Sequence, residues 1–240
     1  MNIIAITRKG TTKVENEDRI VIGKNLLADG SIQTNFSSGV VAVADGVGGN
    51  NAGAVASHFV AQNLTSMGDV SHEVFTQINR SLIQLSETRT DYSKMATTLS
   101  GISVNGDKTV LFSIGNTRVY LLQGRKYLKQ LTKDDTTLNY LLATGQLTAE
   151  TADSFDRKNE ITACFGGGTT QLFKIQCNPV ELFASPFLMT SDGIHDYVTV
   201  DQMEDIIAAH GISLSTCEAL IAAARDEGSH DDASVILGEL

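Results

Sequence analysis

Basic residues are scarce in this chain of 240 residues. It has 18 lysine and arginine residues against 28 aspartate and glutamate residues, which gives a formal net charge of −10. Domains that bind nucleic acid usually carry a basic patch, so this balance argues against nucleic acid as a partner. We expect part of the acidity to serve bound cations and the rest to keep the chain soluble.

Cysteine is also rare, and its spacing excludes two kinds of site. Cys164, Cys177 and Cys217 are odd in number and far apart, with no CxxC pair among them. None is followed by arginine at the spacing of the Cys-x5-Arg loop that cysteine-dependent phosphatases use. The pattern favours reduced and mostly buried thiols in a cytoplasmic protein.

Long hydrophobic runs and linkers are missing as well. No stretch approaches 18 consecutive apolar residues, and residues 1–6 lack the basic leader and apolar run of a signal peptide. With only two prolines, the sequence shows no Pro- or Ser-rich linker, and it contains no repeat. We therefore expect one domain over residues 1–240, in the cytoplasm and without membrane contact.

Short runs rich in β-branched residues predict most of the secondary structure. Asn105-Gly106 and Gln123-Gly124 predict tight reversals, so strands that are neighbours in the sequence should pair antiparallel. The strands are predicted at residues 3–7, 19–23, 40–44, 99–104, 109–114, 118–122, 127–131, 172–176, 187–190 and 233–237.

Apolar residues at helical spacing predict two helices in succession, at about residues 53–67 and 72–86. Met203 to Ile207 and Leu220 to Ala224 suggest a second pair near the C-terminus. Two sheets face to face, each covered by a helix pair, would bury all these apolar faces. The sequence thus predicts an α+β fold, a four-layer α-β-β-α sandwich with mainly antiparallel sheets.

Four short acidic motifs carry the chemistry. Carboxylates packed together repel by about 4 kcal/mol per pair at 4 Å and an effective dielectric near 20. A fold that gathers several of them without adjacent lysine or arginine implies a bound cation, and oxygen ligands favour magnesium, manganese or calcium over zinc. The motifs are Asn16-Glu17-Asp18, Asp45-Gly46-Val47-Gly48-Gly49, Ser191-Asp192-Gly193 and His230-Asp231-Asp232.

Eight segments, taken in order along the chain, resemble the metal-dependent serine/threonine protein phosphatases, the type 2C or PPM family, in a compact bacterial form. The resemblance implies the same α-β-β-α sandwich, with a flap-like segment at about residues 134–160 beside the active site. The segments begin at residues 13, 43, 96, 114, 131, 159, 190 and 231, with sequences KVENED, VADGVGG, ATTL, IGNTRVY, LTKDD, NEITACFG, TSDG and DDASV.

The resemblance also implies a set of metal ligands. Asp45 would bridge two metal ions, with the Gly46 carbonyl as a further ligand. Glu17 would bind the second metal, and Asp192 and Asp231 would bind the first. Asp45, Asp192 and Asp231 would then be catalytic through a water activated by two Mn²⁺ or Mg²⁺ ions, with no covalent enzyme intermediate. The implied reaction is hydrolysis of phosphoserine and phosphothreonine in phosphoproteins, the products of a Ser/Thr kinase in bacterial signalling.

Two further acidic residues would act outside the ligand set. Asp18 would accept a hydrogen bond from water on the metal, and Asp232 would orient its neighbour Asp231. Asp232 stands where the family more often has asparagine.

Three positions depart from the family pattern. Lys13 stands where family members commonly place an arginine that binds the substrate phosphate; lysine keeps the charge but loses the bidentate fork. Asn116 replaces an aspartate that helps to hold a third metal, so we expect this third site to be weakened or absent. Val47 replaces the histidine that serves some relatives as a possible general acid, so the leaving group should take its proton from water on the metal.

Two alternatives stay open. A degenerate relative could keep the fold and bind phosphoproteins with little turnover, a possibility that Lys13 and Asn116 keep open and the intact main ligands oppose. A phosphatase of the same fold could instead act on a regulatory switch protein or a small phosphoester.

Overall fold

The structure is a computed structural model that describes residues 1–48, 52–65, 67–152, 154–167, 173–182 and 185–239. Gly49 and Leu172, which belong to a predicted motif and a predicted strand, lie outside the described residues. The strands are β1 Asn2–Arg8, β2 Asp18–Ile22, β3 Asn25–Leu27, β4 Gly30–Asn35, β5 Gly39–Val47, β6 Ala96–Thr97, β7 Leu99–Asn105, β8 Lys108–Ile114, β9 Arg118–Gln123, β10 Tyr127–Gln130, β11 Phe165–Gly166, β12 Gln176–Pro179, β13 Phe187–Thr190 and β14 Ala233–Glu239. The helices are α1 Ala52–Leu64, α2 His72–Ser86, α3 Thr137–Ala143, α4 Ala149–Ala152, α5 Asp192–His195, α6 Val200–His210 and α7 Leu214–Asp226, with a 3₁₀ turn at Thr90–Tyr92.

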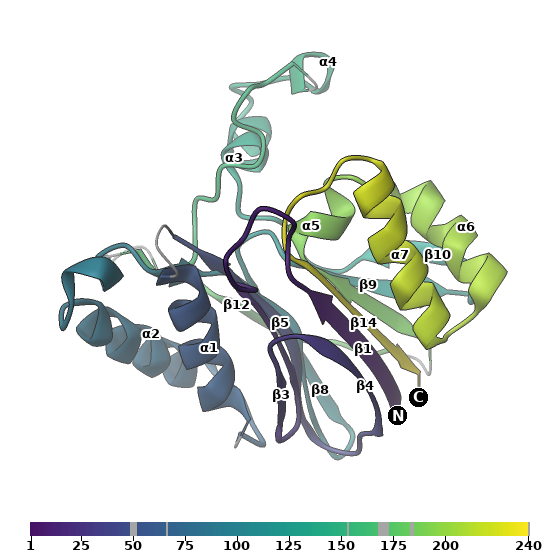
Figure 1. The fold of residues 1–240 in the computed structure, drawn as a ribbon, viewed down its shortest axis with the longest axis horizontal. Coiled ribbons are helices and arrows are strands. Elements are labelled where there is room, and N and C mark those ends of the chain that lie inside the picture. Colours follow the sequence, from purple (N-terminus) through teal and green to yellow (C-terminus); the bar gives the residue numbers. More distant parts are fainter. Residues whose placement is uncertain (49–51, 66, 153, 168–172, 183–184, 240) are drawn as a thin grey trace.

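Two antiparallel sheets form the centre of the molecule. One has the strand order β10-β9-β13-β14-β1-β4. The other has the order β11-β6-β5-β7-β8-β12, with β2 paired to β5 and β3 paired to β2. Helices α1 and α2 lie on one outer side and α5 to α7 on the other (Figure 1). This arrangement confirms the predicted α+β sandwich.

The alternation of side chains along each strand produces three apolar layers. On β1, Ile3 and Ala5 belong to the layer between the sheets, while Ile4 and Ile6 pack under α6 and α7. Phe75 of α2 packs in the third layer with the opposite face of the other sheet. Because successive side chains of a strand point to opposite faces, an inner strand of this kind must be apolar on both. This explains why the strands contain nearly continuous apolar runs.

The structure corrects some predicted boundaries. The strand predicted at residues 172–176 instead begins at Gln176 and continues to Pro179. Phe173 and Ile175 are apolar because they pack in the core from an irregular segment, where the Phe173 ring lies 4.9 Å from that of Phe165. Helix α1 ends at Leu64, a few residues earlier than expected. The sequence also gave no signal for the short elements β3, β4, β6, β11 and α5.

The segment at residues 134–160, called the flap below, projects away from the sandwich and carries α3 and α4 (Figure 1). Neither helix has a buried residue among those described. Its base is fixed by a β-bridge between Thr136 and Ile161 and by reciprocal bonds with Gly115. The Asp135 amide donates to the Gly115 carbonyl at 2.8 Å, and the Gly115 amide donates to Asp135 Oδ2 at 3.0 Å.

Across the described ranges, every helix is too short or too polar to cross a membrane.

Candidate metal centre

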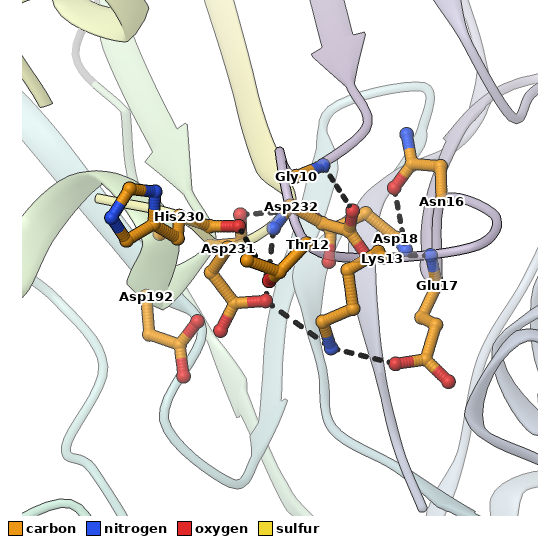
Figure 2. Close-up of polar contacts among 12 residues, drawn as sticks. Gly10, Thr12, Lys13, Asn16, Glu17, Asp18, Asp192, His230, Asp231 and Asp232 are labelled. Carbon is orange, nitrogen blue, oxygen red and sulfur yellow. Dashed lines mark hydrogen bonds and ion pairs between the residues drawn. The ribbon is translucent and has the colours of Figure 1, made fainter. Parts of the chain in front are cut away.

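Strand pairing brings the acidic motifs to one edge of the sandwich. Asp18 begins β2 and is the register partner of Asp45 near the end of β5. Asp192 follows β13, and Asp231 precedes β14, which pairs with β13. Figure 2 shows Lys13, Glu17, Asp192 and Asp231 in one group, from segments far apart in the sequence. The fold therefore gathers side chains that the sequence could only name separately.

Close approach of two glycines shapes one side of the site. A Cβ placed on Gly53, in the first turn of α1, would lie 2.6 Å from the Gly46 carbonyl oxygen and 2.7 Å from Glu17 Oε1. Any side chain at this position would collide with both oxygens, so glycine is required for helix and strand to approach. Two predicted metal ligands, Glu17 and the Gly46 carbonyl, thus converge on the same small space.

The carboxylate cluster, which we define as Asp18, Asp45, Asp192 and Asp231, is electrostatically strained. Burial raises the pKa of Asp45 well above its usual value, and the negative charges of Asp192, Asp18 and Asp231 raise it further. Burial and the charge of Asp231 likewise raise the pKa of Asp192. Burial raises the pKa of Asp18 to about 8. A divalent cation stabilises carboxylates that lie this close together, because it offsets their mutual repulsion.

Asp18 links the two sheets. Its Oδ2 accepts hydrogen bonds from the hydroxyls of Ser191 and Ser234, each at 2.7 Å, whereas its buried Oδ1 has no partner among the described residues. Burying an acceptor without a partner is costly. Water on a bound cation would satisfy this oxygen, so Asp18 also fits a metal centre. Both serines belong to motifs that the sequence singled out, but their role could not be seen there.

Lys13 lies between two predicted ligands. Its Nζ is 2.7 Å from Glu17 Oε2 and 3.2 Å from Asp231 Oδ1 (Figure 2). Burial alone would lower the Lys13 pKa, but the hydrogen bond to Glu17 and the charges of Asp231 and Glu17 raise it overall. In this arrangement the ammonium group partly neutralises the acidic ligands, which corrects the expectation that no lysine or arginine lies beside them. Among the described residues, no group of three or more His, Cys, Asp or Glu side chains is arranged to hold a metal ion.

Asp232 fixes the loop that carries Lys13 and Glu17. Its Oδ1 accepts from the Gly10 amide at 2.6 Å and its Oδ2 from the Glu17 amide at 2.7 Å. Its own amide donates to Asp231 Oδ1 at 2.9 Å. The residue thus contacts both its neighbour and a distant loop, with its carboxylate bonded to main-chain amides.

Asn116 contacts the centre directly. Its Nδ2 donates to Asp192 Oδ2 at 3.0 Å, which lowers the Asp192 pKa against the effect of burial. The amide therefore places a donor where an aspartate would have placed another negative charge. Of the two histidines beside acidic motifs, His195 hydrogen-bonds Thr190 and His230 hydrogen-bonds Thr11.

Comparison with known proteins gives the family. The sequence profile of the family Protein phosphatase 2C matches residues 24–224, which is more than half of the chain. The chain belongs to the protein phosphatase 2C family. Glu17 and Asp231 lie outside the matched residues, whereas Asp45 and Asp192 lie within them.

Two relatives in this family are similar over nearly their whole length. The serine/threonine phosphatase stp of Listeria welshimeri is 28% identical, with 97% of this chain and 93% of the relative aligned. Protein phosphatase PhpP of Streptococcus pneumoniae is 29% identical, with 99% and 96% aligned. The crystal structure of the Mycobacterium tuberculosis serine/threonine phosphatase PstP/Ppp superposes with a TM-score of 0.81 at 25% identity and covers 100% of this chain and 99% of its own. The catalytic domain of PstP in complex with two manganese ions shares the fold, with a TM-score of 0.76 at 24% identity. That comparison covers 100% of this chain and 99% of the other.

Proposed function

We propose that this protein hydrolyses phosphoserine and phosphothreonine in phosphoproteins and depends on divalent metal ions for this reaction. The observation that carries the proposal is the convergence of Asp45, Asp192 and Asp231 from three separate strand ends, close enough for their charges to raise the Asp45 pKa. Membership of the protein phosphatase 2C family and relatives named serine/threonine phosphatases support the same conclusion. The substrates would be proteins phosphorylated by a Ser/Thr kinase in the cytoplasm.

The predicted ligands suit two Mn²⁺ or Mg²⁺ ions by the chemistry of their oxygen donors, although within the described residues no three His, Cys, Asp or Glu side chains are arranged around one ion. Asp45 would contribute to both ions, Asp192 and Asp231 to the first, and Glu17 with the Gly46 carbonyl to the second. When bound, such a pair of ions activates water and neutralises charge on the phosphoryl group. All five ligands present oxygen, which suits these hard cations.

The chain's own residues position the substrate. Lys13 would bind a phosphoryl oxygen, exchanging its contacts with Glu17 and Asp231 for one with the phosphate. Asp232 would keep Lys13 and Glu17 in place by holding the loop amides. Val47 is 39% exposed in the loop after Asp45 and cannot donate a proton, so the leaving group would take its proton from water held at the metal centre.

The thiols do not suit a nucleophilic mechanism. Burial raises the pKa of Cys164, raises that of Cys177 to about 11, and raises that of Cys217 to about 12. Because the thiolate is the reactive form, such cysteines would be inert at neutral pH. This agrees with direct attack by water.

A third metal would bind weakly, because Asn116 offers an amide donor to Asp192 instead of a carboxylate ligand. A crystal soaked in millimolar manganese should show two occupied sites beside Asp45 and no fully occupied third site beside Asn116. Full occupancy of a third site would disprove this part of the proposal.

Hydrolysis of p-nitrophenyl phosphate tests the function. We expect turnover with Mn²⁺ that EDTA abolishes and that Asp192→Ala removes. Asp205→Ala, which changes an exposed aspartate on α6, is the matched control and should keep full activity.

A binding module of the same fold is the alternative. It is favoured by the substitutions at Lys13 and Asn116. Calorimetry that shows Mn²⁺ binding to a chain without turnover on p-nitrophenyl phosphate or phosphopeptides would establish it in place of the enzyme.

A further inference from the structure

A cavity of about 540 Å³ adjoins the metal centre. On one side it is lined by Asp134 and Lys158 of the flap base. On the other side it is lined by His195, the last residue of α5, and by Asp196, which follows that helix. Asn116 lines the cavity and also donates to Asp192, so the cavity begins one side chain away from the carboxylate cluster. A peptide bound at the metal centre through its phosphorylated residue can therefore place a flanking side chain in this space.

The acidic side chains of the cavity already have hydrogen-bond donors, and Asp134 is also paired with a cation. The single N–H of Arg118 Nε is shared between Asp134 Oδ1 at 3.1 Å and Oδ2 at 3.0 Å, and Arg118 Nη2 donates to Oδ2 at 2.6 Å. Gln130 Nε2 donates to the same carboxylate at 2.9 Å. Asp196 accepts from Asn159 Nδ2 at 2.6 Å.

Two lysine side chains at the cavity, in contrast, have no anionic partner within ion-pair distance among the described residues. Lys133 and Lys158 line it, both are exposed, and neither forms an ion pair with any described residue. Three basic side chains thus face two acidic ones, on a chain whose net charge is −10. Since Arg118 and Asp134 neutralise each other, the two lysines remain against Asp196, which leaves a surplus of one positive charge.

The side of the cavity near the metal centre is polar and incompletely bonded. Asn116 and His195 are 3% and 7% exposed. Asn116 Oδ1 and His195 Nε2 are buried and have no hydrogen-bond partner in the described part of the chain. Buried polar atoms without partners are rare in folded proteins, and a ligand or water at the site usually satisfies them. The inner side of the cavity therefore favours a polar ligand over an apolar one.

We propose that this cavity, the flap-base cavity, is a substrate subsite that receives an acidic side chain next to the phosphorylated residue. The proposal rests on the phosphatase function proposed above and names its substrate class, proteins with aspartate or glutamate near the phosphorylation site. Lys133 and Lys158 supply the charge that attracts the carboxylate. His195 Nε2 donates to it in the tautomer whose Nδ1 accepts from the Thr190 hydroxyl, and Asn116 Oδ1, which is an acceptor, binds water beside it. The volume suffices for one long side chain with bound water.

Matched phosphopeptides test the subsite. Peptides with one phosphothreonine carry glutamate, glutamine or lysine at a single position, scanned from three residues before to three residues after it. For at least one position, we expect kcat/KM with glutamate to exceed that with glutamine by about 5-fold and that with lysine by more. The difference should shrink at high salt, because the lysines are exposed.

Variants of the cavity decide whether this selectivity arises there. The ratio of kcat/KM between the glutamate and lysine peptides should fall toward one in Lys133→Gln/Lys158→Gln and should invert in Lys133→Glu/Lys158→Glu. Lys108→Gln is the matched control, because Lys108 is an exposed lysine at the opposite end of β8 and should leave the ratio unchanged. The ratio compares two substrates of one variant, so a general loss of activity does not affect it.

Two results would overturn the subsite. One is equal kcat/KM for the glutamate, glutamine and lysine peptides at every position of the scan. The other is a glutamate preference that persists in Lys133→Gln/Lys158→Gln. Either result, obtained with metal-dependent hydrolysis of p-nitrophenyl phosphate intact, would leave the proposed function standing; absence of all turnover would remove that function instead.

Discussion

The carboxylate cluster and the flap base are neighbours, but the protein holds them in different ways. Asp18 and Asp45 start from paired positions of two buried strands, so main-chain hydrogen bonds of the sheet fix their separation. The flap contributes no buried helix residue and is held at its base by contacts such as Arg118 to Asp134 and Asn159 to Asp196. Elements with few buried contacts can open without global unfolding. We therefore expect rigid positioning of the metal ligands and separate opening of the flap.

Asp45→Asn should have the largest effect of the variants that distinguish the carboxylate cluster from the flap base. It should lower kcat by about 10²-fold or more, because the substitution removes the charge predicted to bridge both metals. In EDTA the same variant should be more stable than the unmodified chain by about 1 kcal/mol, since one of several like charges is gone. Turnover with Mn²⁺ and urea unfolding in EDTA measure the two effects. Unchanged turnover would show that the cluster does not form the active site.

Lys13→Met should have the next largest effect. Loss of one charge-assisted hydrogen bond to the phosphate should lower kcat/KM by about 10- to 100-fold. Mn²⁺ should bind more tightly, because Lys13 would no longer neutralise Glu17 and Asp231 in the metal-free protein.

Calorimetry with Mn²⁺ and kinetics with p-nitrophenyl phosphate separate these two consequences of removing Lys13. Lys13→Arg is the control and should retain activity, since arginine is the residue that family members commonly place there. Weaker Mn²⁺ binding by Lys13→Met would contradict the competition between lysine and metal.

Asp134→Ala should act on the flap alone. It removes the partner of Arg118, and a hydrogen-bonded charge pair of this kind contributes about 2 kcal/mol. Amide exchange in residues 134–160 should become faster while exchange in β2 and β5 stays the same. Asp91→Ala, which breaks the exposed pair with Arg89, is the control and should change neither region. Faster exchange throughout the sheets would refute the independence of the flap.

The smallest expected effect is a pH-dependent difference in thermal stability. The folded-state pKa values of Asp18, about 8, and of Asp45 and Asp192 are raised above the values of the unfolded chain. The folded metal-free protein therefore holds protons that the unfolded chain has lost above about pH 4, so these groups make stability fall as the pH rises toward 8. Bound cations replace these protons.

The difference between the melting temperatures in Mn²⁺ and in EDTA should thus widen between pH 5.5 and 8, by about 5 °C. Scanning fluorimetry measures it, and Asp45→Asn should show a smaller widening. A difference that narrows with rising pH would contradict the raised pKa values.

The sequence by itself determined the layers of this protein. β-Branched runs and helical periodicity located the main strands, and the predicted helix at residues 72–86 coincides with α2, which Ser71 caps. Periodicity succeeds here because each apolar face must meet another layer. The sequence also showed the acidic motifs, but it did not show how they lie relative to one another in the folded chain.

Only the tertiary structure decided the contacts made across the sandwich. The serine hydroxyls on Asp18 come from 173 and 216 residues away, and Lys13 bridges to Asp231 from the other end of the chain. Such contacts follow from strand register and loop path, and a single polar side chain leaves no periodic trace in a sequence. The surplus charge of the flap-base cavity likewise exists only once Arg118 has paired with Asp134 and left Lys133 and Lys158 free of ion pairs among the described residues.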